Sequence, residues 1–529
     1  MKKILVIRLS AIGDIILTSP AVLNLRLSFP DSIIFFLTRP RTSHIAKLIP
    51  GVGEVIEFPE NASFIDLFKM GEFLDKMAFD MIIDLHGNFR SYYLMYRVSA
   101  PIKVHYGKRR WERFKAVCRG RGKRLNLLPP HTIDLYNAAV EKAGGRIYAR
   151  RPSLRLPSRS GNPRLFENDR PIIAIAPGAS YPTKKWPAER FRKLASAIHN
   201  NMAANIVFIL TEHERELAGL NKEIPKEQIK ILINEEITNL TGYLKQADIL
   251  VCNDSALSHL GSAVGTPVIT LFGPTHPTLG FAPRGMKDVI IQVDEPCRPC
   301  SLHGKKPCFR EEQFCFTRIT VDDVLSRINK MIKEKAKGEK SIFVDRDGTL
   351  IKEKEFIKDP EKVEPEEKSI EAIRLANSHG YKVVVISNQS GVARGFFEER
   401  DVGRINERIL EIFRQHGAII DDILYCPHYP GGSIPEYAIN CACRKPSPGM
   451  IEKACEKHNI NPFCSFVIGD KLSDIQLAYV TGGRGILVRT GYGRGKEALL
   501  KNSGSLEPET VADNLFNGVN YILNLNDNR

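Results

Sequence analysis

The sequence predicts an α/β protein built on parallel sheets, and three observations support this fold class. Short apolar runs alternate with longer amphipathic segments along most of the 529 residues, as strands alternate with crossover helices in parallel sheets. Polar motifs rich in Gly, Asp and Ser directly follow several of the apolar runs, where ligands meet the carboxyl ends of strands. Two stretches without periodicity divide the chain into three blocks.

The first block, residues 1–155, opens the alternation. Its expected strands are Lys3–Ile7, Ser32–Leu37 and Met81–Leu85, and its expected helices are Ser19–Leu27 and Phe64–Lys76. The Pro- and Ser-rich segment 151–163 shows no periodicity and is predicted to connect two domains.

The second block, residues 170–335, continues the same alternation. Its expected strands are Ile172–Ala176, Ile206–Thr211, Ile229–Ile233, Ile249–Asn253 and Val268–Phe272. A helix over Val321–Lys335 should end this block, because a charged, Gly-containing stretch follows it. The third block, residues 341–525, begins with an apolar run that ends in Asp345.

The composition is that of a globular protein, with 43% hydrophobic and 26% charged residues. No run of about 18 apolar residues is present and no cleavable leader is evident, so we expect a cytoplasmic location. Residues 1–340 carry a net charge of +18 and residues 341–529 a net charge of −3. The excess peaks at 103–124, with ten basic residues and one acid. This segment is either a solvated face or a surface for a polyanion, among which nucleic acid is the least favoured.

Two carboxylates begin the third block in an arrangement typical of phosphoryl transfer. Asp345 and Asp347 lie two residues apart after a predicted strand, so both can face one small site. One carboxylate can attack a phosphoryl group while the other handles the proton.

Later strand ends add groups that bind phosphate. Ser387 and Asn388 offer a hydroxyl and an amide, and Arg444 and Lys445 offer positive charge. Lys445 is expected to neutralise the phosphoryl group and the nucleophile.

Acidic groups at the same strand ends predict a Mg²⁺ site. The candidate ligands are Asp345, Asp347 and Asp470, because Mg²⁺ prefers carboxylate, water and phosphate oxygens. Asp474 is either a group outside the ligand shell or an ordinary acid at a helix start.

Seven of the eleven cysteines fall into two groups. Cys426 and His428 are separated by twelve residues from Cys441 and Cys443, a pattern that predicts a closed, structural Zn²⁺ site. The set Cys297, Cys300, Cys308 and Cys315 either binds zinc or consists of packed, reduced thiols.

Three turns in the first two blocks follow predicted strands. They contain Asp14, Ser180 and the pair Asp254 and Ser255. The last pair opens a predicted helix whose free backbone N–H groups suit a pyrophosphate, although a plain helix cap is an equal alternative.

The third block resembles the haloacid dehalogenase (HAD) superfamily, on Asp345-Arg-Asp-Gly-Thr349, Ser387-Asn388, Arg444-Lys445 and Gly469-Asp470. The zinc loop and Val488-Arg-Thr-Gly-Tyr-Gly493 narrow this to D-glycero-D-manno-heptose 1,7-bisphosphate 7-phosphatases. The resemblance implies a doubly wound α/β domain, an aspartyl-phosphate on Asp345 and acid/base catalysis by Asp347. Histidinol-phosphate phosphatases share a similar loop and remain an alternative.

Residues 1–335 resemble the heptosyltransferases of lipopolysaccharide core synthesis, on Gly13-Asp14, Pro177-Gly-Ala-Ser180, Lys184-Lys-Trp-Pro187, Thr211-Glu-His-Glu214, Asn253-Asp-Ser-Ala-Leu-Ser-His259 and Phe272-Gly-Pro-Thr275. This implies two facing Rossmann-like domains of the GT-B type, with the acceptor on the first and ADP-heptose on the second.

That resemblance also implies a role for each matching residue. Asp14 would be the general base, Lys184 would bind the donor phosphates, and Glu212 would hold the ribose. Ser180 and the helix start at Asp254 and Ser255 would complete the donor site.

Together the two resemblances imply a bifunctional enzyme of heptose metabolism. It would hydrolyse the 7-phosphate of heptose 1,7-bisphosphate and transfer heptose from ADP-heptose to an anionic lipopolysaccharide core acceptor. We expect Mg²⁺ and Zn²⁺ as cofactors, no nucleic acid, and peripheral contact with the cytoplasmic face of the inner membrane. The alternatives are a histidinol-phosphate phosphatase fused to another glycosyltransferase, and a non-catalytic membrane or scaffold module before a phosphatase.

Overall fold

The computed structural model describes residues 2–119, 130–156, 163–219, 223–500 and 506–527. Parts of two segments predicted above, 151–163 and 103–124, therefore lie outside the described residues. The chain divides into two compact units: Met1–Ser28 with Ser32–Lys337, and Gly338–Arg529 with Phe29–Asp31. All three sheets are parallel throughout, as predicted.

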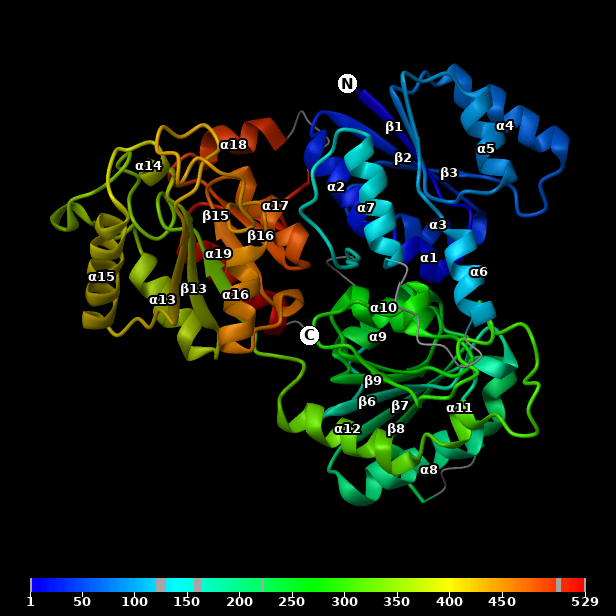
Figure 1. Ribbon diagram of the computed structural model, residues 1–529. Helices are drawn as coiled ribbons and strands as arrows, with labels where there is room; N and C mark the ends of the chain where they lie inside the picture. Colours follow the sequence, from blue (N-terminus) through cyan, green and yellow to red (C-terminus); the bar gives the residue numbers. More distant parts are fainter. Residues whose placement is uncertain (1, 120–129, 157–162, 220–222, 501–505, 528–529) are drawn as a thin grey trace. The chain divides into compact units, whose positions relative to one another are not determined.

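The first sheet has the strand order β3-β2-β1-β4-β5. Its strands are β1 (Lys2–Ile7), β2 (Ser32–Thr38), β3 (Glu54–Glu57), β4 (Met81–Asp84) and β5 (Ile102–His105). The helices around it are α1 (Ile12–Ile16), α2 (Ser19–Ser28), α3 (Pro40–Ala46), α4 (Phe64–Lys76), α5 (Phe89–Arg97), α6 (Arg110–Arg119) and α7 (Thr132–Lys142). Apolar residues of α4 and α5 pack on one face of the sheet, and α2 and α7 pack together on the other (Figure 1).

The second sheet has the order β11-β10-β9-β6-β7-β8. Its strands are β6 (Ile172–Ala176), β7 (Asn205–Leu210), β8 (Ile229–Ile233), β9 (Ile249–Asn253), β10 (Val268–Leu271) and β11 (Val289–Ile291). Its helices are α8 (Ala188–Asn201), α9 (Ile237–Gln246), α10 (Ala256–Val264), α11 (Phe314–Thr317) and α12 (Val321–Lys333), with 3₁₀ turns at Pro182–Lys184 and Glu212–Gly219. α8 and α12 share one core, and α9 and α10 cover the opposite face (Figure 1).

The two sheets of the first unit are joined by contacts between their helices and loops. Helix α1 touches α10. The Thr132 N–H at the start of α7 donates to the Gly280 carbonyl at 2.9 Å, and Arg284 forms an ion pair with Asp134 at 2.6 Å. These contacts bring the end of β1 and the start of α10 to one place.

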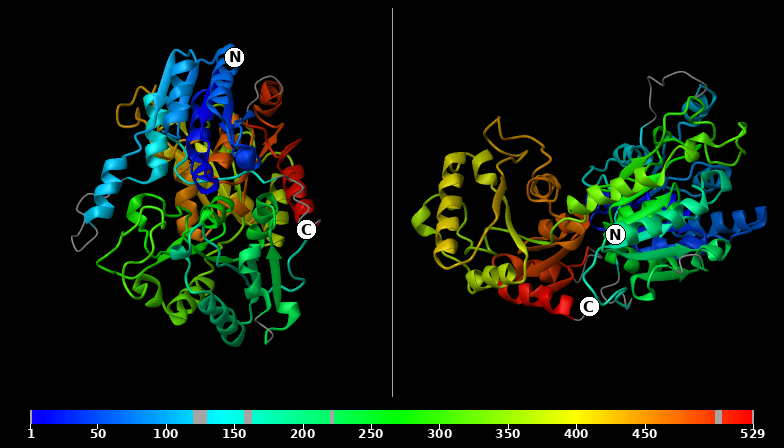
Figure 2. Two further views of the ribbon diagram at one scale, coloured as in Figure 1. Left: turned by 90° about the vertical axis from the view of Figure 1, so that its right-hand side faces the viewer. Right: turned by 90° about the horizontal axis from the view of Figure 1, so that it is seen from below.

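The second unit, coloured yellow-green to red in Figure 2, holds a six-stranded sheet in the order β14-β13-β12-β15-β16-β17. Its strands are β12 (Ser341–Val344), β13 (Lys382–Asn388), β14 (Asp422–Cys426), β15 (Phe466–Gly469), β16 (Arg484–Val488) and β17 (Thr510–Ala512). Its helices are α13 (Ser369–Ser378), α14 (Ser390–Ala393), α15 (Glu399–Gln415), α16 (Gly449–His458), α17 (Leu472–Thr481), α18 (Gly493–Leu500) and α19 (Leu515–Asp527). One core joins the sheet to α13, α15 and α19, while α17 contacts β15 and β16.

This order places β12 in the middle of the sheet, between β13 and β15. The residues that follow these three strands therefore meet at one edge, as carboxyl ends of parallel strands do.

Candidate functional site

The centre of the second unit is a buried ammonium group held between carboxylates. Lys445 Nζ lies 2.8 Å from Asp345 Oδ1 and 2.6 Å from Asp474 Oδ1, and it donates to the Ile386 carbonyl at 3.0 Å. All three charged side chains are at most 4% exposed. Burial alone would raise the pKa of Asp345, but Lys445 and Lys471 outweigh it and hold that pKa below its usual value.

Three carboxylates converge at this point. One oxygen each from Asp345, Asp470 and Asp474 lies within 4.8 Å of the others. Burial and the neighbouring Asp345 raise the pKa of Asp470 to about 7. Asp470 Oδ1 is buried and accepts no hydrogen bond from the described residues, and Lys471 Nζ lies 3.7 Å away. A buried carboxylate oxygen left in this way fits a divalent cation.

Two glycines allow the backbone to approach Asp470 closely. Gly348 has φ of +82°, and a Cβ there would lie 2.5 Å from Asp470 Oδ2; a Cβ at Gly491 would also overlap that atom. The Tyr492 N–H donates to the same oxygen at 2.8 Å. The Gly348 of the Asp-x-Asp-Gly motif therefore leaves room for the Asp470 carboxylate.

The Asp347 carboxylate, also predicted as a metal ligand, lies apart from the group formed by Asp345, Asp470 and Asp474. It lies 3.1 Å from the buried Arg346 guanidinium and accepts from Gln389 Nε2 at 2.7 Å. Ser387 Oγ lies 3.4 Å from the same carboxylate. The Asp347 side chain therefore contacts Arg346 and the residues at the end of β13, and not Asp470.

Asp474 takes the third place in the cluster and combines both roles considered for it. Its Oδ2 accepts from the Lys471 N–H at the start of α17, and its Oδ1 pairs with Lys445. Asn388, a predicted phosphate ligand, instead exchanges two hydrogen bonds with the Lys445 backbone, at 3.0 and 3.3 Å.

The predicted zinc ligands form a second cluster in this unit. The ligand atoms of Cys426, His428, Cys441 and Cys443 all lie within 4.8 Å of one another. The sulfur–sulfur separations are 3.2 to 3.4 Å, and His428 Nδ1 lies 3.4 Å from the Cys443 sulfur. Two sulfurs bound to a tetrahedral zinc at about 2.3 Å lie about 3.8 Å apart. The four ligand atoms already surround one point, and the sulfurs would need to spread by only about 0.5 Å to hold the ion.

The Cys/His cluster is connected to the carboxylate cluster through Arg444 and Lys445. Arg444 donates to the His428 carbonyl at 3.0 Å, and its guanidinium lies 5.0 Å from the Tyr429 ring centre. The adjacent Lys445 occupies the carboxylate cluster. Because Arg444 contacts the Cys/His loop and Lys445 is the next residue, a change in that loop should displace Lys445 as well.

The other four cysteines behave differently. Cys297, Cys300, Cys308 and Cys315 line one small cavity of about 10 Å³ together with Thr183 and Gln313. Among the described residues, however, only the two clusters above bring three or more ligand atoms within 4.8 Å.

In the first unit, Asp14 lies in α1, directly after β1. Arg8 forms an ion pair with it, while another guanidinium nitrogen of Arg8 donates to the Leu85 carbonyl at 2.7 Å. Burial would raise the pKa of Asp14, but Arg8 and His259 outweigh it and lower that pKa. His259 of α10 packs on Gly13, where a Cβ would lie 2.8 Å from its ring, and burial lowers its pKa to about 4. Elements of both sheets thus meet at Asp14.

The turn that contains Lys184 faces the start of α10. Lys184 Nζ lies 2.7 Å from Asp254 Oδ2, and the Thr275 hydroxyl donates to the same oxygen at 2.7 Å. Ser255 is the N-cap residue of α10, but its buried hydroxyl makes no cap bond. The Ser255 side chain therefore accepts no hydrogen bond from the first N–H groups of α10. This favours an anion-binding role for the helix start over a simple N-cap.

The neighbouring acids separate into two positions. Glu214 Oε1 lies 2.5 Å from Lys185 Nζ, and a Cβ on Gly178 would lie 3.6 Å from Glu214 Oε2. Glu212, the acid predicted to hold a ribose, is 54% exposed and pairs with Arg215 at 2.6 Å. Ser180 is exposed in the turn after β6.

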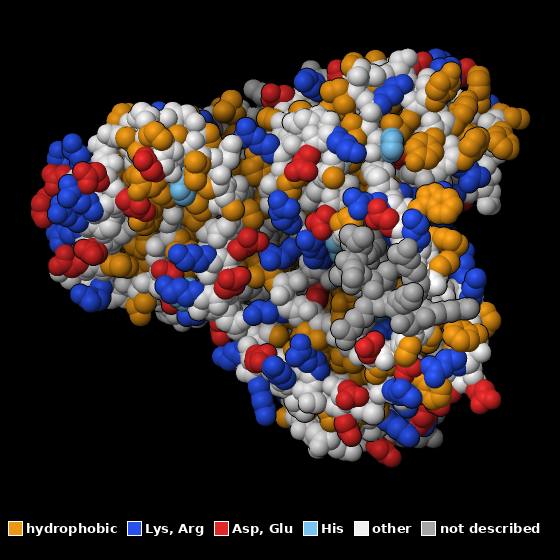
Figure 3. All heavy atoms as spheres, in the orientation of Figure 1, with side chains coloured by type: hydrophobic (Ala, Val, Ile, Leu, Met, Phe, Trp, Pro, Cys, Tyr) orange, Lys and Arg blue, Asp and Glu red, His pale blue; other side chains and the backbone are white. Residues whose placement is uncertain are grey.

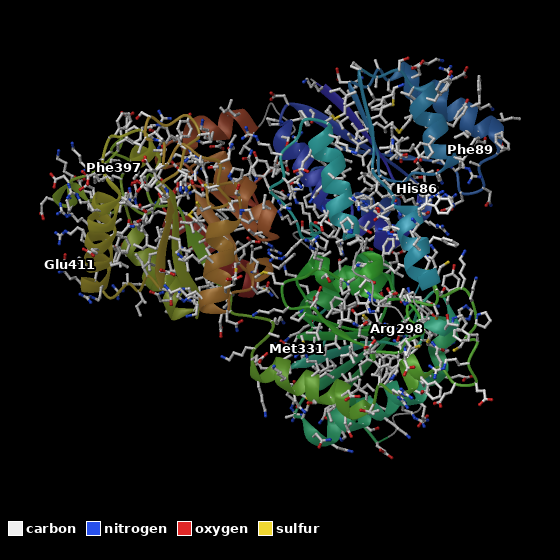
Figure 4. The ribbon with its side chains drawn as sticks, in the orientation of Figure 1. His86, Phe89, Arg298, Met331, Phe397 and Glu411 are labelled. Carbon is white, nitrogen blue, oxygen red and sulfur yellow. The ribbon has the colours of Figure 1, made fainter. Side chains whose placement is uncertain are left out.

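Sequence reasoning missed several groups that hold these sites. Arg346 and Gln389 orient Asp347, and Glu214 takes the buried place beside Lys185. Arg298, labelled in Figure 4, donates to the Gly273, Val293 and Thr275 carbonyls and so holds the turn that positions Thr275. Arg346 and Glu214 lie inside the motifs given above and Gln389 directly follows the pair Ser387-Asn388, whereas no motif or spacing marks Arg298.

Comparison with known proteins identifies both units. Residues 67–308 match the family model of glycosyltransferase family 9 (heptosyltransferase), and residues 442–517 match the HAD-hydrolase-like model. The crystal structure of a glycosyltransferase family 9 protein from Veillonella parvula is 20% identical, with a TM-score of 0.51, over 63% of this chain and 98% of that one. The first unit thus has the GT-B fold.

Curated relatives match the second unit. The D-glycero-α-D-manno-heptose-1,7-bisphosphate 7-phosphatase of Photorhabdus laumondii is 38% identical over 178 residues, which are 34% of this chain and 93% of the relative. The β-anomer phosphatase of Haemophilus ducreyi is 35% identical over 187 residues, 35% of this chain and 99% of the relative. The chain therefore belongs, through its HAD-type second unit, to the heptose-1,7-bisphosphate 7-phosphatase family, and its first unit matches the glycosyltransferase family 9 (heptosyltransferase) model over residues 67–308.

Proposed function

We propose that this bifunctional, heptose-related enzyme hydrolyses the 7-phosphate of D-glycero-D-manno-heptose 1,7-bisphosphate and transfers heptose from ADP-heptose to a lipopolysaccharide core acceptor. The observation that carries the hydrolase is the convergence of Asp345, Asp470 and Asp474 around Lys445. The observation that carries the transferase is the meeting of Asp14 with α10, whose start faces Lys184.

In the phosphatase, Asp345 is the nucleophile. Its carboxylate oxygen bonds to phosphorus while the bond from phosphorus to the sugar oxygen breaks. Asp347 donates a proton to that leaving oxygen and then accepts one from the water that hydrolyses the aspartyl-phosphate. Lys445 offsets the charge of the nucleophile and the phosphoryl group, and Gln389 with Arg346 holds Asp347 in place. The buried Ser387 hydroxyl and Arg444 complete the phosphate side.

Mg²⁺ fits between Asp345 and Asp470, because Asp470 Oδ1 is buried without a hydrogen-bond donor among the described residues. Bound there, the ion would supply positive charge to the transferring phosphoryl group. Zn²⁺ fits Cys426, His428, Cys441 and Cys443, and with four protein ligands it would be structural.

In the transferase, Asp14 takes the proton of the acceptor hydroxyl as that oxygen bonds to the anomeric carbon. The bond from this carbon to the ADP oxygen breaks, and the configuration inverts. Negative charge then grows on the diphosphate, where Lys184 and the start of α10 lie. Glu214, beside Lys185 and Gly178, is better placed than Glu212 to meet a buried hydroxyl of the donor.

The proposed setting is the cytoplasmic side of the inner membrane, where a nucleotide sugar and a lipid-linked acceptor meet. Among the described residues, no helix combines the length and apolar character needed to cross a bilayer.

Two assays on the purified full-length chain test this proposal. Heptose 1,7-bisphosphate, as separate α and β anomers, should release one phosphate faster than histidinol phosphate does. ADP-heptose should label a defined core acceptor. Faster turnover of histidinol phosphate would replace the hydrolase substrate, and no transfer to any core acceptor would leave the first unit as a binding module.

A further inference from the structure

The first unit exposes an unusual number of aromatic side chains in one region. Among the described residues, eighteen large hydrophobic side chains are exposed, and ten of them fall between residues 64 and 114. These ten are Phe64, Ile65, Phe68, Phe73, Phe89, Tyr92, Tyr96, Ile102, Trp111 and Phe114. A soluble surface rarely gathers apolar side chains in this way unless it meets another molecule.

Helices α4 and α5 carry most of this surface and lie against each other. The Phe64 and Phe89 rings meet edge to face, 6.4 Å apart. Along α5, Phe89, Tyr92 and Tyr96 follow at spacings of three and four residues and are 67%, 45% and 87% exposed, which places them on one outward stripe. Phe89 is labelled in Figure 4. The inward stripe of the same helix packs on the sheet, so the outward aromatic side chains are not needed for the core.

Helix α6 repeats this division. Arg113 and Ala116 are buried, while Trp111 and Phe114 are 75% and 57% exposed and lie 6.1 Å apart. Lys115 is exposed beside them. Exposed Trp with Lys on one helical stripe is typical of helices that lie at a membrane interface.

The same region is positively charged. Residues 64–119 contain eleven Lys and Arg and six Asp and Glu. Several of the acids are already engaged: Asp66 caps α4, Asp75 pairs with Arg97, and Glu112 pairs with Arg109. Figure 3 shows hydrophobic side chains gathered over α4 and α5, with Lys and Arg beside them.

We propose that the exposed faces of α4, α5 and α6, the α4–α6 surface, dock on the headgroup region of an anionic lipid bilayer. Aromatic rings enter the interface while Lys and Arg meet lipid phosphates. Lys is depleted in protein–protein interfaces, whereas Lys69, Lys76, Lys103 and Lys115 are all exposed on or beside these helices. This mixture favours a bilayer over a protein partner.

The surface adjoins the acceptor side of the proposed transferase site. Lys108 donates to the His86 carbonyl at 3.1 Å and Arg110 to the Gly87 carbonyl at 2.9 Å, so the start of α6 is fastened to the end of β4. Strand β4 lies next to β1, which ends before Asp14. Docking on α4–α6 would bring a lipid-linked acceptor to the edge of the sheet that holds the base; only this last step rests on the proposed function.

Vesicle flotation of the full-length chain, without either substrate, tests the surface. Wild type should float with vesicles of phosphatidylglycerol and phosphatidylethanolamine, should float far less with phosphatidylcholine alone, and should be released by salt. Phe64→Ser with Phe89→Ser and Tyr96→Ser should lower the vesicle partition coefficient at least tenfold. Lys103→Glu with Lys115→Glu should lower it only for the anionic vesicles.

The matched control is Leu410→Ser with Ile419→Ser and Ile439→Ser, three exposed apolar side chains of the second unit, which should leave flotation unchanged. An unchanged urea unfolding transition in every variant, followed by the fluorescence of Trp111 and Trp186, would report that the first unit is folded. Equal flotation of the aromatic variant and wild type would refute the proposal that the α4–α6 surface binds the bilayer. So would a dimer of wild type in light scattering that the aromatic variant abolishes, because a second copy would then cover these helices. If wild type floats as expected but transfers no heptose to any core acceptor, the result would count against the proposed function alone.

Discussion

Replacement of Lys445 by Met offers the sharpest test of the electrostatics in the second unit. The substitution removes the ammonium that lies 2.8 Å from Asp345 and 2.6 Å from Asp474, but it keeps a side chain of similar length. At an effective dielectric constant of about 20, each of these contacts contributes roughly 6 kcal/mol of attraction. Desolvation of the buried ammonium offsets much of it, and loss of one partner from a buried ion pair costs about 3–5 kcal/mol.

We therefore expect Lys445→Met to lower the unfolding free energy of the second unit by about 3–5 kcal/mol in EDTA at pH 8. Without the ammonium, the folded-state pKa values of the carboxyl groups lie above their unfolded values. A carboxyl group with a raised folded-state pKa destabilises the folded state as the pH rises from its unfolded to its folded pKa. The loss of unfolding free energy caused by Lys445→Met should therefore be smaller at pH 5 than at pH 8. Added Mg²⁺ should restore part of the loss, and phosphatase activity should fall by at least 100-fold.

Urea unfolding can separate the two units. Both tryptophans, Trp111 and Trp186, lie in the first unit, so fluorescence follows that unit while circular dichroism follows both. Lys471→Met is the control, because Lys471 is 36% exposed and its Nζ lies 3.7 Å from Asp470 Oδ1. It should shift the unfolding transition of the second unit less than Lys445→Met does. A Lys445→Met protein within about 1 kcal/mol of wild type in EDTA at pH 8 would refute the claim that Lys445 forms stabilising buried ion pairs with Asp345 and Asp474.

Three further predictions concern the zinc loop and the transferase. Purified protein should contain one zinc per chain; Cys441→Ser should lose it and reduce phosphatase activity on the order of 10–100-fold, whereas Cys464→Ser should keep both, and zinc retained in Cys441→Ser would exclude the cluster. Asp14→Asn should slow heptosyl transfer on the order of 10²–10⁴-fold without changing ADP affinity or phosphatase activity, and full transfer by this variant would remove Asp14 from the base role. Glu214→Gln should weaken ADP-heptose binding in calorimetry more than Glu212→Gln does, because Glu214 is buried beside Lys185 while Glu212 pairs with Arg215 at the surface; the reverse order would restore Glu212.

Much of the fold could be predicted because its strands are local apolar runs. Helix Phe64–Lys76 and strand Ile249–Asn253 have the predicted bounds. Strand β5, by contrast, is exposed at three of its four residues, so its sequence carries no apolar run to detect. The gathering of Cys426, His428, Cys441 and Cys443 could be predicted because the two residues of each pair are close in sequence and therefore spatially constrained.

Within the candidate sites, the sequence determined which chemical groups follow which strands: Asp345 after β12, Lys445 after the zinc ligands, and Asp14 after β1. Tertiary structure alone decided the pairings. It brought Asp474 rather than Asp347 to Asp470, and Glu214 rather than Glu212 to Lys185. A motif specifies positions along one strand, whereas an ion pair depends on how separate strands and helices pack, and buried charges require partners wherever that packing places them.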